Sequence, residues 1–334
     1  MPLDDLTPRL DRRFSVAPMI DVTDRHYRYL ARLLSKHALL YTEMITTGAI
    51  LNGDQDYLLS YTHQEHPLVL QLGGSNTDEL AQCARIGESY GYDEINLNVG
   101  CPSDKVQNHM IGACLMAHPK LVADCMQSMI EAVKIPVTIK HRIGIDDVDD
   151  YDVLAGFVEQ VNQSGCDTFI VHARNAILKG LSPKQNREVP PLQYEKVYRL
   201  KEDFPNLEII INGGIDNIAD CQQHLTKVDG VMLGRAANHN SAILTQVDQQ
   251  LYGSNLAIPQ RREVSLAYFT YMQQQHEKGT SLHHMSGHVM GLFQGIPGAR
   301  ALRRHISEHI HGSSATIQVM YDALDLIETA PTPV

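Results

Sequence analysis

Short apolar runs rich in β-branched residues recur along the chain, and longer segments with helical character separate them. Eight runs have the length of strands: Phe14–Ala17, Leu39–Thr42, Leu68–Leu72, Glu94–Asn98, Val137–Lys140, Thr168–His172, Glu208–Asn212 and Gly230–Leu233. Helix-like stretches between them include Thr77–Tyr90, Pro119–Val133, Asp150–Ser164, Leu192–Asp203 and Ile218–Thr226. Strands that alternate with helices build parallel sheets, and eight repeats favour closure. The pattern therefore predicts an α/β fold, a (β/α)8 TIM barrel.

An open doubly wound sheet is the other fold with this alternation. A dinucleotide-binding sheet would carry a G-x-G-x-x-G pattern after an early strand. None of the eight runs is followed by that pattern. The closed barrel remains the prediction.

The pattern changes near Tyr252. From Arg261 onward, apolar residues recur at helical spacing in four stretches, which are REVSLAYFTYMQQQ, HHMSGHVMGLF, GARALRRHISEHI and ATIQVMYDALDLI. We therefore expect two domains, a catalytic barrel over residues 1–250 and a small all-helical domain over residues 251–334.

Composition sets further limits. The 334 residues are 43% hydrophobic and 20% charged, as in an ordinary globular protein. The first segment, MPLDDLTPRLDRRF, lacks the basic start and apolar core of a signal peptide, and no stretch approaches the ~20 apolar residues of a membrane span. Six cysteines show no C-x-x-C spacing, which favours reduced thiols. We expect a cytoplasmic protein with no membrane partner.

The formal net charge of −11 argues against a nucleic-acid partner, because phosphate contacts normally require an excess of Lys and Arg. Any such partner must be bound by a local basic patch.

Polar or special residues stand where each predicted strand ends. They are Pro18 and Met19, Glu43, Gln71, Asn98 with Cys101, Lys140 with Arg142, His172 with Arg174, Asn212, and Gly234 with Arg235. Any loop supplies polar residues, so a single instance carries little weight. Because barrel enzymes place their chemistry at the carboxyl ends of the strands, the recurrence predicts an active-site rim.

The loops after the seventh and eighth strands carry NGGI (Asn212–Ile215) and LGRA (Leu233–Ala236). Barrels commonly bind phosphate there. Gly213 and Gly214 allow a close backbone approach, and Arg235 can add a guanidinium fork. The pair of motifs predicts a phosphate site.

The segment NLNVGCPSDKVQNHMIGACLM (Asn96–Met116) resembles the active-site signature of the tRNA-dihydrouridine synthases. Six further motifs occur in the family's order: APMIDVTD, VLQLGG, TIKHRIG, FIVHAR, INGGI and LGRA. The resemblance covers nearly the whole chain. The loop Lys179–Leu192 and the tail GLFQGIPGARALRRHISE resemble the A-type subgroup, which acts on uridines 20 and 20a of the tRNA D-loop.

The resemblance implies that FMN is bound, that NADPH is the reductant and that tRNA is the substrate. Reduction of a uracil C5–C6 bond needs a hydride at C6, from flavin N5, and a proton at C5. A thiol with an ordinary pKa near ~8.5 is protonated at neutral pH yet acidic enough to donate. Cys101, three residues after the predicted fourth strand, is the expected proton donor. The alternative of a small buried apolar residue is our interpretation of the other five cysteines.

Further roles follow from the same resemblance. Lys140, as the last residue of the fifth strand, is expected beside the flavin N1–C2 edge, unless it only snorkels at a strand end. Gln71 is expected on the pyrimidine part of the flavin and His172 on its ring or phosphate. The expected cofactor-binding set is Ala17, Pro18, Met19, Gln71, Lys140, His172, Asn212, Gly213, Gly214, Gly234 and Arg235. Glu43 and Asn98 either orient the flavin or the target base, or solvate the rim.

A uracil within RNA must leave its stack to reach such a site, and the protein must hold the backbone around it. Two basic groups qualify: Lys179, Lys184 and Arg187, and Arg300, Arg303 and Arg304. Each group could also be a solvated surface. The expected RNA-binding set is Asn98, His109, Lys184, Arg187, Arg300 and Arg303. No protein partner is implied, and we expect a monomer.

Three histidines, His283, His284 and His288, include a pair one helical turn apart. No carboxylate or thiol stands at ligand spacing near them, so we expect no metal. An exposed helical face explains them as well.

Two other functions remain open at this stage. A flavin-dependent free-pyrimidine or dihydroorotate-type dehydrogenase would share the barrel and FMN, but would have no use for the helical tail with its arginines. A non-catalytic RNA-binding protein that retains FMN is the other, and the intact Cys101 and Lys140 argue against it.

Overall fold

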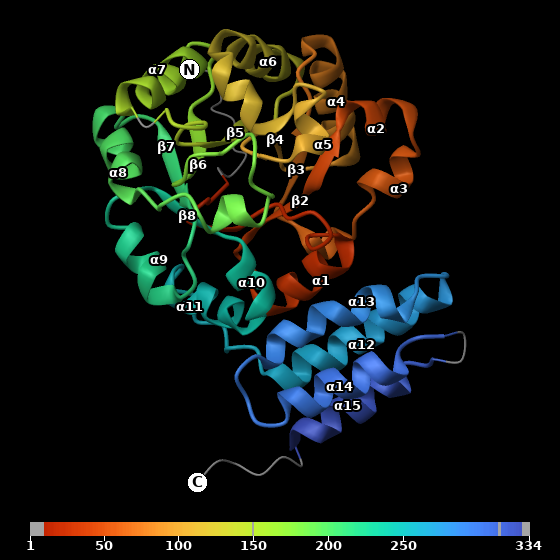
Figure 1. The fold of residues 1–334 in the computed structure, drawn as a ribbon. Helices are drawn as coiled ribbons and strands as arrows, with labels where there is room; N and C mark the ends of the chain where they lie inside the picture. The colour runs from red at the N-terminus through yellow and green to blue at the C-terminus, as the bar shows by residue number, and fades with distance from the viewer. Residues whose placement is uncertain (1–9, 149, 313–314, 329–334) are drawn as a thin grey trace, which may run out of the picture.

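The computed structural model describes residues 10–148, 150–312 and 315–328 and contains a closed barrel of parallel strands (Figure 1). Each strand pairs with its neighbours in chain order, and the first pairs with the last. The strands are β1 (Phe14–Val16), β2 (Leu39–Thr46), β3 (Leu68–Gly73), β4 (Glu94–Val99), β5 (Val137–Arg142), β6 (Thr168–His172), β7 (Glu208–Asn212) and β8 (Gly230–Leu233). The predicted TIM barrel is confirmed.

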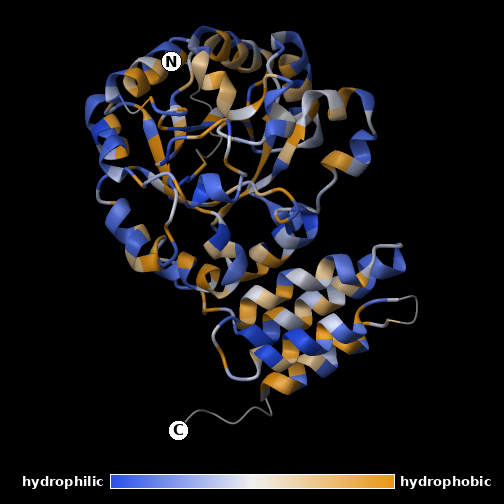
Figure 2. Cartoon of the chain, in the orientation of Figure 1, coloured by the Kyte–Doolittle hydropathy of each residue, from blue (hydrophilic) through white to orange (hydrophobic). Residues whose placement is uncertain are grey.

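Helices surround the barrel and alternate along their length between hydrophobic and hydrophilic positions, as amphipathic helices do (Figure 2). They are α1 (Arg25–Leu34), α2 (Thr47–Asn52), α3 (Gln55–Leu59), α4 (Thr77–Tyr90), α5 (Asp104–Gln107), α6 (Pro119–Ala132), α7 (Tyr151–Asn162), α8 (Tyr194–Asp203), α9 (Ile218–His224), α10 (Arg235–His239) and α11 (Val247–Gln250). Short 3-10 turns are η1 (His63–Glu65), η2 (Gly112–Ala117), η3 (Gln185–Arg187) and η4 (Ser241–Gln246).

The strands separate two cores. The outer core fills the space between strands and helices and is apolar. Inside the barrel, a small apolar cluster consists of Ala17, Leu39, Tyr41, Val69, Ile170, Ile210 and Met232. Buried polar side chains, among them Glu94, Asn96 and Thr138, also lie in the core. Successive side chains along one strand therefore point alternately into the inner core and the outer core.

Four strands extend beyond their predicted ends, β3 and β4 by one residue and β2 and β5 by more. β2 continues to Thr46 after a register shift between Tyr41 and Met44, and β5 continues to Arg142. The apolar runs stop earlier, but neighbouring strands continue to pair with the polar residues that follow. Lys140 is therefore inside β5, not at its end.

Four helices and a turn follow the barrel: α12 (Arg261–Glu277), α13 (Leu282–Val289), η5 (Met290–Phe293), α14 (Ala299–His309) and α15 (Gln318–Glu328). They pack on one another, and α12 and α13 also contact α1 of the barrel (Figure 1). The expected helical tail is confirmed, while the domain boundary at residue 250 stays a prediction. Among the described helices, none is long and apolar enough to cross a membrane.

Candidate active site

Cys101 is the second residue after β4, one position closer than the sequence indicated, because the strand extends to Val99. Its side chain is partly exposed and its thiol is free. The Oδ1 atom of Asn98 accepts hydrogen bonds from the backbone N–H groups of Gly100, at 3.1 Å, and Cys101, at 2.9 Å. On the other side, the N–H of Ala113 donates to the Cys101 carbonyl oxygen at 2.8 Å. The cysteine loop is thus held from both sides.

Gln71 lies beneath this loop with 1% of its surface exposed. Its Oε1 accepts from Asn98 Nδ2 at 2.8 Å, and its Nε2 donates to Asn96 Oδ1 at 2.8 Å. The Nε2 atom of Gln71 therefore keeps one free N–H, and its Oε1 keeps one free lone pair. Flavin binding by Gln71 and RNA binding by Asn98 stay predictions, and the structure places Asn98 as a support of the Cys101 backbone.

Lys140 lies beside Asn98 in the β4–β5 register and donates from Nζ to Asn212 Oδ1 at 3.2 Å. Burial, and then the nearby Arg142, lower the pKa of Lys140 to about 7. The ammonium group therefore changes charge near neutral pH. Asn212 is fixed in turn, because its Nδ2 donates to the Met232 carbonyl at 2.8 Å.

Arg142, named from the sequence only as a rim residue, is absent from the expected cofactor-binding and RNA-binding sets. It is 2% exposed, and its guanidinium donates to three carbonyl oxygens, those of Gly100 at 3.1 Å, Asn175 at 3.1 Å and Asn186 at 3.0 Å. It therefore connects the Cys101 loop to the loop after β6. Its position two residues after Lys140 was the available signal, since alternate residues of a strand share a face.

Positive charge gathers in the barrel mouth. Burial lowers the pKa of His172 well below its ordinary value, and the cationic side chains of Arg142, Lys140, Arg174 and Arg187 lower it further, so the imidazole is neutral. In the described part of the chain, no carboxylate pairs with Arg142 or Lys140. Such a cluster attracts anions.

The loops after β7 and β8 contain the glycines of the predicted phosphate site. Gly213 and Gly214 adopt φ values of +119° and +70°, and a Cβ on Gly213 would lie 2.7 Å from Cδ2 of His172. A Cβ on Gly234 would lie 3.7 Å from Ala17 Cβ and 3.9 Å from Met19 Sδ, so the first and last strand ends meet there. Over the described ranges, the N–H groups of Gly213, Gly214 and Gly234 donate no hydrogen bond. Free N–H groups beside cations fit a phosphate group.

Arg235 and the loop after β6 contact each other. The Arg235 guanidinium donates to Glu188 Oε1 at 2.7 Å and to the Arg187 carbonyl at 3.3 Å. Pro18 and Arg187 are partly exposed, and Lys184 is exposed. The roles expected for these residues stay predictions.

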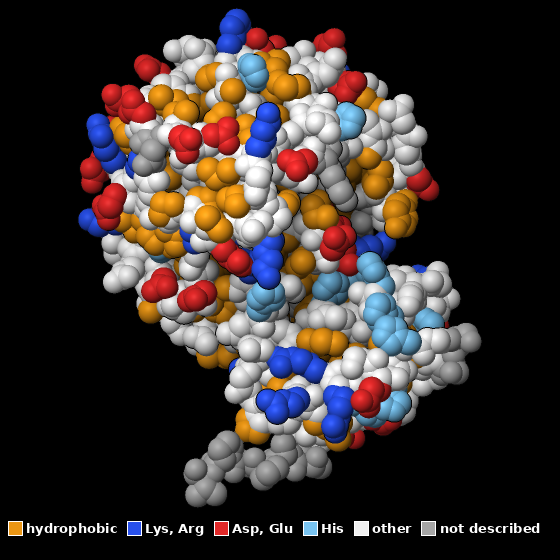
Figure 3. Space-filling model, viewed as in Figure 1, with side chains coloured by type: hydrophobic (Ala, Val, Ile, Leu, Met, Phe, Trp, Pro, Cys, Tyr) orange, Lys and Arg blue, Asp and Glu red, His pale blue; other side chains and the backbone are white. Residues whose placement is uncertain are grey.

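The other basic group lies on α14. Figure 3 shows Lys and Arg side chains gathered on the helical bundle, on the face that also carries the barrel mouth. Arg300 is exposed, and Arg303 donates to Gln294 and lines a cavity of about 220 Å³ between α10 and α14. His109 is exposed in the turn after α5. Arg303 lines this cavity, whereas Arg300 and His109 do not.

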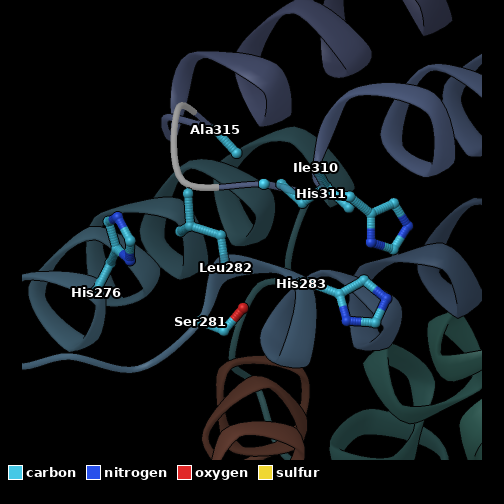
Figure 4. A pocket seen from close by; sticks show the side chains of 8 residues that line it. His276, Ser281, Leu282, His283, Ile310, His311 and Ala315 are labelled. Atoms are coloured by element: carbon cyan, nitrogen blue, oxygen red, sulfur yellow. The ribbon is translucent and has the colours of Figure 1, made fainter.

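A second cavity of about 220 Å³ lies within the helical bundle and contains none of the expected site residues (Figure 4). His283 and His311 face each other beside it, with ring centroids 4.3 Å apart. His284 and His288 instead contact Asp24, at 3.1 and 3.2 Å. Among the described residues, no three His, Cys, Asp or Glu side chains are grouped as metal ligands would be.

Comparison with known proteins identifies the family. The dihydrouridine synthase (Dus) family matches residues 15–328. The chain belongs to the dihydrouridine synthase family. The resemblance seen in the sequence is thereby confirmed.

Curated relatives match along nearly their whole length. The tRNA-dihydrouridine(20/20a) synthase of Shewanella oneidensis is 56% identical over 320 residues, which cover 96% of this chain and 95% of that protein. The protein of the same name from Pseudomonas aeruginosa is 56% identical over 318 residues, 95% of this chain and 96% of the relative. The Escherichia coli K12 protein, also of that name, is 55% identical and covers 94% of this chain and 91% of its own length.

Proposed function

We propose that this dihydrouridine synthase reduces the C5–C6 double bond of uridines 20 and 20a in the tRNA D-loop, with bound FMN and with NADPH as the reductant. The observation that carries the proposal is the partly exposed thiol of Cys101, held by Asn98 at a cationic barrel mouth. The similarity to relatives named tRNA-dihydrouridine(20/20a) synthases supports the choice of uridines. A free-pyrimidine dehydrogenase has no comparable support.

The barrel mouth fits FMN. Free N–H groups on Gly213, Gly214 and Gly234 suit its phosphate, and the cationic groups nearby suit its negative charge. When bound, FMN supplies the hydride for uracil C6. The proposed cofactor-binding residues are Ala17, Pro18, Met19, Gln71, Lys140, His172, Asn212, Gly213, Gly214, Gly234 and Arg235.

Cys101 is the proposed acid, which donates the proton on Sγ to C5 of the uracil. The transfer leaves negative charge on sulfur, and the buried guanidinium of Arg142 lies against the Cys101 loop, where it donates to the Gly100 carbonyl at 3.1 Å. Cations fixed in a partly buried site stabilise such charge without reorganisation of solvent. Asn98 keeps the loop in place during the transfer.

The proposed RNA contacts are local, in line with a net charge of −11. Lys184, Arg187 and His109 lie around the mouth, and Arg300 and Arg303 lie on α14. The face shared by the mouth and α14 supports simultaneous contact with a bent RNA (Figure 3). Because one chain offers both surfaces, we propose a monomer, and we place it in the cytoplasm with its tRNA substrate.

The test is to incubate unmodified tRNA with FMN-loaded protein and NADPH, and to map dihydrouridine by nucleoside mass spectrometry. The proposal expects product at positions 20 and 20a. Cys101→Ala should bind tRNA and FMN but lose turnover, whereas Cys114→Ala, at the other partly exposed thiol, should retain it. NADPH oxidation with free uracil or dihydroorotate, and no product on tRNA, would contradict it.

A further inference from the structure

The hydrogen bonds that support Cys101 continue deep into the barrel. Asn96, which accepts from Gln71, donates from Nδ2 to Thr138 Oγ1 at 2.9 Å. Thr138 donates from Oγ1 to Glu94 Oε1 at 2.6 Å. Asn96, Thr138 and Glu94 are all buried. An unbroken series of side chains therefore joins Glu94 to the Cys101 loop.

The inner end of the series is an ion pair. Arg12 donates from Nε and Nη2 to Glu94 Oε2, both at 2.7 Å, and from Nη1 to Glu208 Oε2 at 2.8 Å. The hydroxyl of Tyr41 also donates to Glu94 Oε1, at 3.3 Å. A carboxylate paired in this way with a guanidinium can only accept hydrogen bonds.

Both ends of the series fix its direction. At Glu94 only acceptors are present, so Thr138 must donate to the carboxylate and must accept from Asn96 Nδ2. At the Cys101 loop only backbone N–H donors are present, so Asn98 must turn its Oδ1 toward them. Every amide between the two ends has one orientation that satisfies all its partners.

We propose that Thr138 is a positioning residue for this enzyme: with Glu94 it selects the amide orientation of Asn96 from the inner end of the series, and together with the loop N–H groups at the outer end it holds Gln71 and Asn98 in theirs. The inference rests on the proposed function, because the groups so oriented are the Cys101 loop and the amide expected on FMN.

The physical reason is that a carboxamide has two orientations of nearly equal shape. Without the Thr138 hydroxyl, Asn96 loses the acceptor that selects one of them. A reversed Asn98 would point its NH₂ group at the N–H groups of Gly100 and Cys101, and the loop would move. If Gln71 were reversed, its free N–H and its free lone pair would exchange places, and the amide would offer the opposite pattern to FMN.

The experiment compares Thr138→Val with Thr138→Ser. Valine keeps the shape and removes the hydroxyl, whereas serine keeps the hydroxyl. In Thr138→Val we expect kcat to fall on the order of 10- to 100-fold with little change in KM for tRNA, because the acid is misplaced. Thr138→Ser should recover most of this loss.

Two further readouts do not need turnover. In a Cys114→Ala background the remaining cysteines besides Cys101 are buried, so iodoacetamide reports on Cys101 alone. Thr138→Val should change the rate and pH profile of this alkylation without tRNA. It should also shift the visible spectrum and the midpoint potential of FMN in the loaded protein, since Gln71 is affected.

Thr168→Val is the matched control. Thr168 is also buried, on β6, and donates to Asp167 and to Glu208. Among the contacts of the described residues, it reaches the series only through Glu208 and Arg12, on the far side of Glu94 from Cys101. This variant should keep the wild-type alkylation profile and flavin spectrum. Equal changes in both valine variants, or no rescue by serine, would overturn the proposal.

The outcomes also separate this inference from the proposed function. If wild-type protein makes dihydrouridine and Thr138→Val matches it in kcat, alkylation and spectrum, only the positioning role fails. If wild-type protein makes no dihydrouridine but Thr138→Val still changes Cys101 alkylation and Thr168→Val does not, the positioning role holds and the proposed function fails.

Discussion

Gly112 lies directly against Cys101 across the loop that follows β4. A Cβ on Gly112 would be 2.4 Å from the carbonyl oxygen of Cys101 and 3.1 Å from its Cβ. Gly112 also has a φ of +83°, which L side chains rarely adopt. Glycine is therefore required at position 112 for two independent reasons, the positive φ and the close contact. A side chain there would press on Cys101, the proposed acid.

The first prediction is that Gly112→Ala lowers kcat by about 10- to 100-fold, because a displacement near 1 Å has that effect on a positioned group. Gly279→Ala is the control, since Gly279 has a φ of +98° but open space around its would-be Cβ. Both variants should lose stability from backbone strain, by about 1 kcal/mol or more, measured by urea unfolding. Equal activity in the two variants would contradict the role of the contact.

The second prediction concerns the pH dependence of FMN binding. Burial and Arg142 lower the pKa of Lys140 to about 7, so its ammonium is charged below that pH and neutral above it. An anion binds the charged form better and takes up a proton on binding. Affinity should therefore fall as pH rises from 7 to 9, by up to about tenfold per unit.

Fluorescence titration of FMN measures this slope. Lys140→Met carries no charge at any pH, so it should bind FMN weakly and with little dependence on pH. Lys140→Arg stays charged over the whole range, so it should bind FMN strongly and also with little dependence on pH. A wild-type profile as flat as that of Lys140→Met would show that this lysine does not interact with the cofactor.

The third prediction concerns the contact between the barrel and α13. Asp24 caps α1 by accepting from the N–H groups of His26 and Tyr27, both at 2.8 Å, and also contacts His284 and His288. Burial alone would raise the pKa of Asp24, but the hydrogen bond and charge of His288 hold it at about 2. A lowered carboxyl pKa stabilises the fold above the unfolded value, near ~4, and this stability is lost as pH falls toward 2.

Asp24→Asn keeps the helix cap and removes the charge. It should cost about 2 kcal/mol of unfolding free energy near pH 6, and the difference from wild type should shrink between pH 4 and 2, as urea unfolding can show. Asp150→Asn is the control, because Asp150 caps α7 on an exposed surface by accepting from Asp152. A similar loss of unfolding free energy in both variants would show that the effect comes from the helix cap and not from the contact with α13.

The fourth prediction tests the basic surface on α14. Arg303→Glu should weaken tRNA binding and reduce the slope of log affinity against log salt by about 1 for the lost phosphate contact. Lys120→Glu, on α6 at the far end of the barrel from α14, removes an exposed cation and should leave both quantities unchanged (Figure 1). Filter binding over a range of salt concentrations measures both.

Much of the fold followed from local pattern. All eight strands occur where β-branched runs predicted them, because a strand buried on both faces is apolar over its length. The ends of β2 and β5 did not follow. Thr46 and Arg142 are polar, and pairing with Gly73 and His172 of the neighbouring strands keeps their backbones in the sheet.

The site was predicted in part. Motif order identified Cys101 and the family, and strand ends indicated the rim. Spacing from Lys140 indicated only the face of β5 on which Arg142 lies, and its three acceptors could not be derived because they come from two loops far apart in the sequence. Asn98 was assigned to RNA, whereas its contacts support the Cys101 backbone.

The sequence by itself therefore determined the barrel and the family, and it predicted the rim and the acid, since these depend on residue type and on short-range periodicity. The tertiary structure decided which polar residues meet inside the barrel. Glu94 and Asn96 on β4 meet Thr138 on β5 only when the two strands pair in register. Hydrogen-bond direction is a property of the assembled network, and no local pattern contains it.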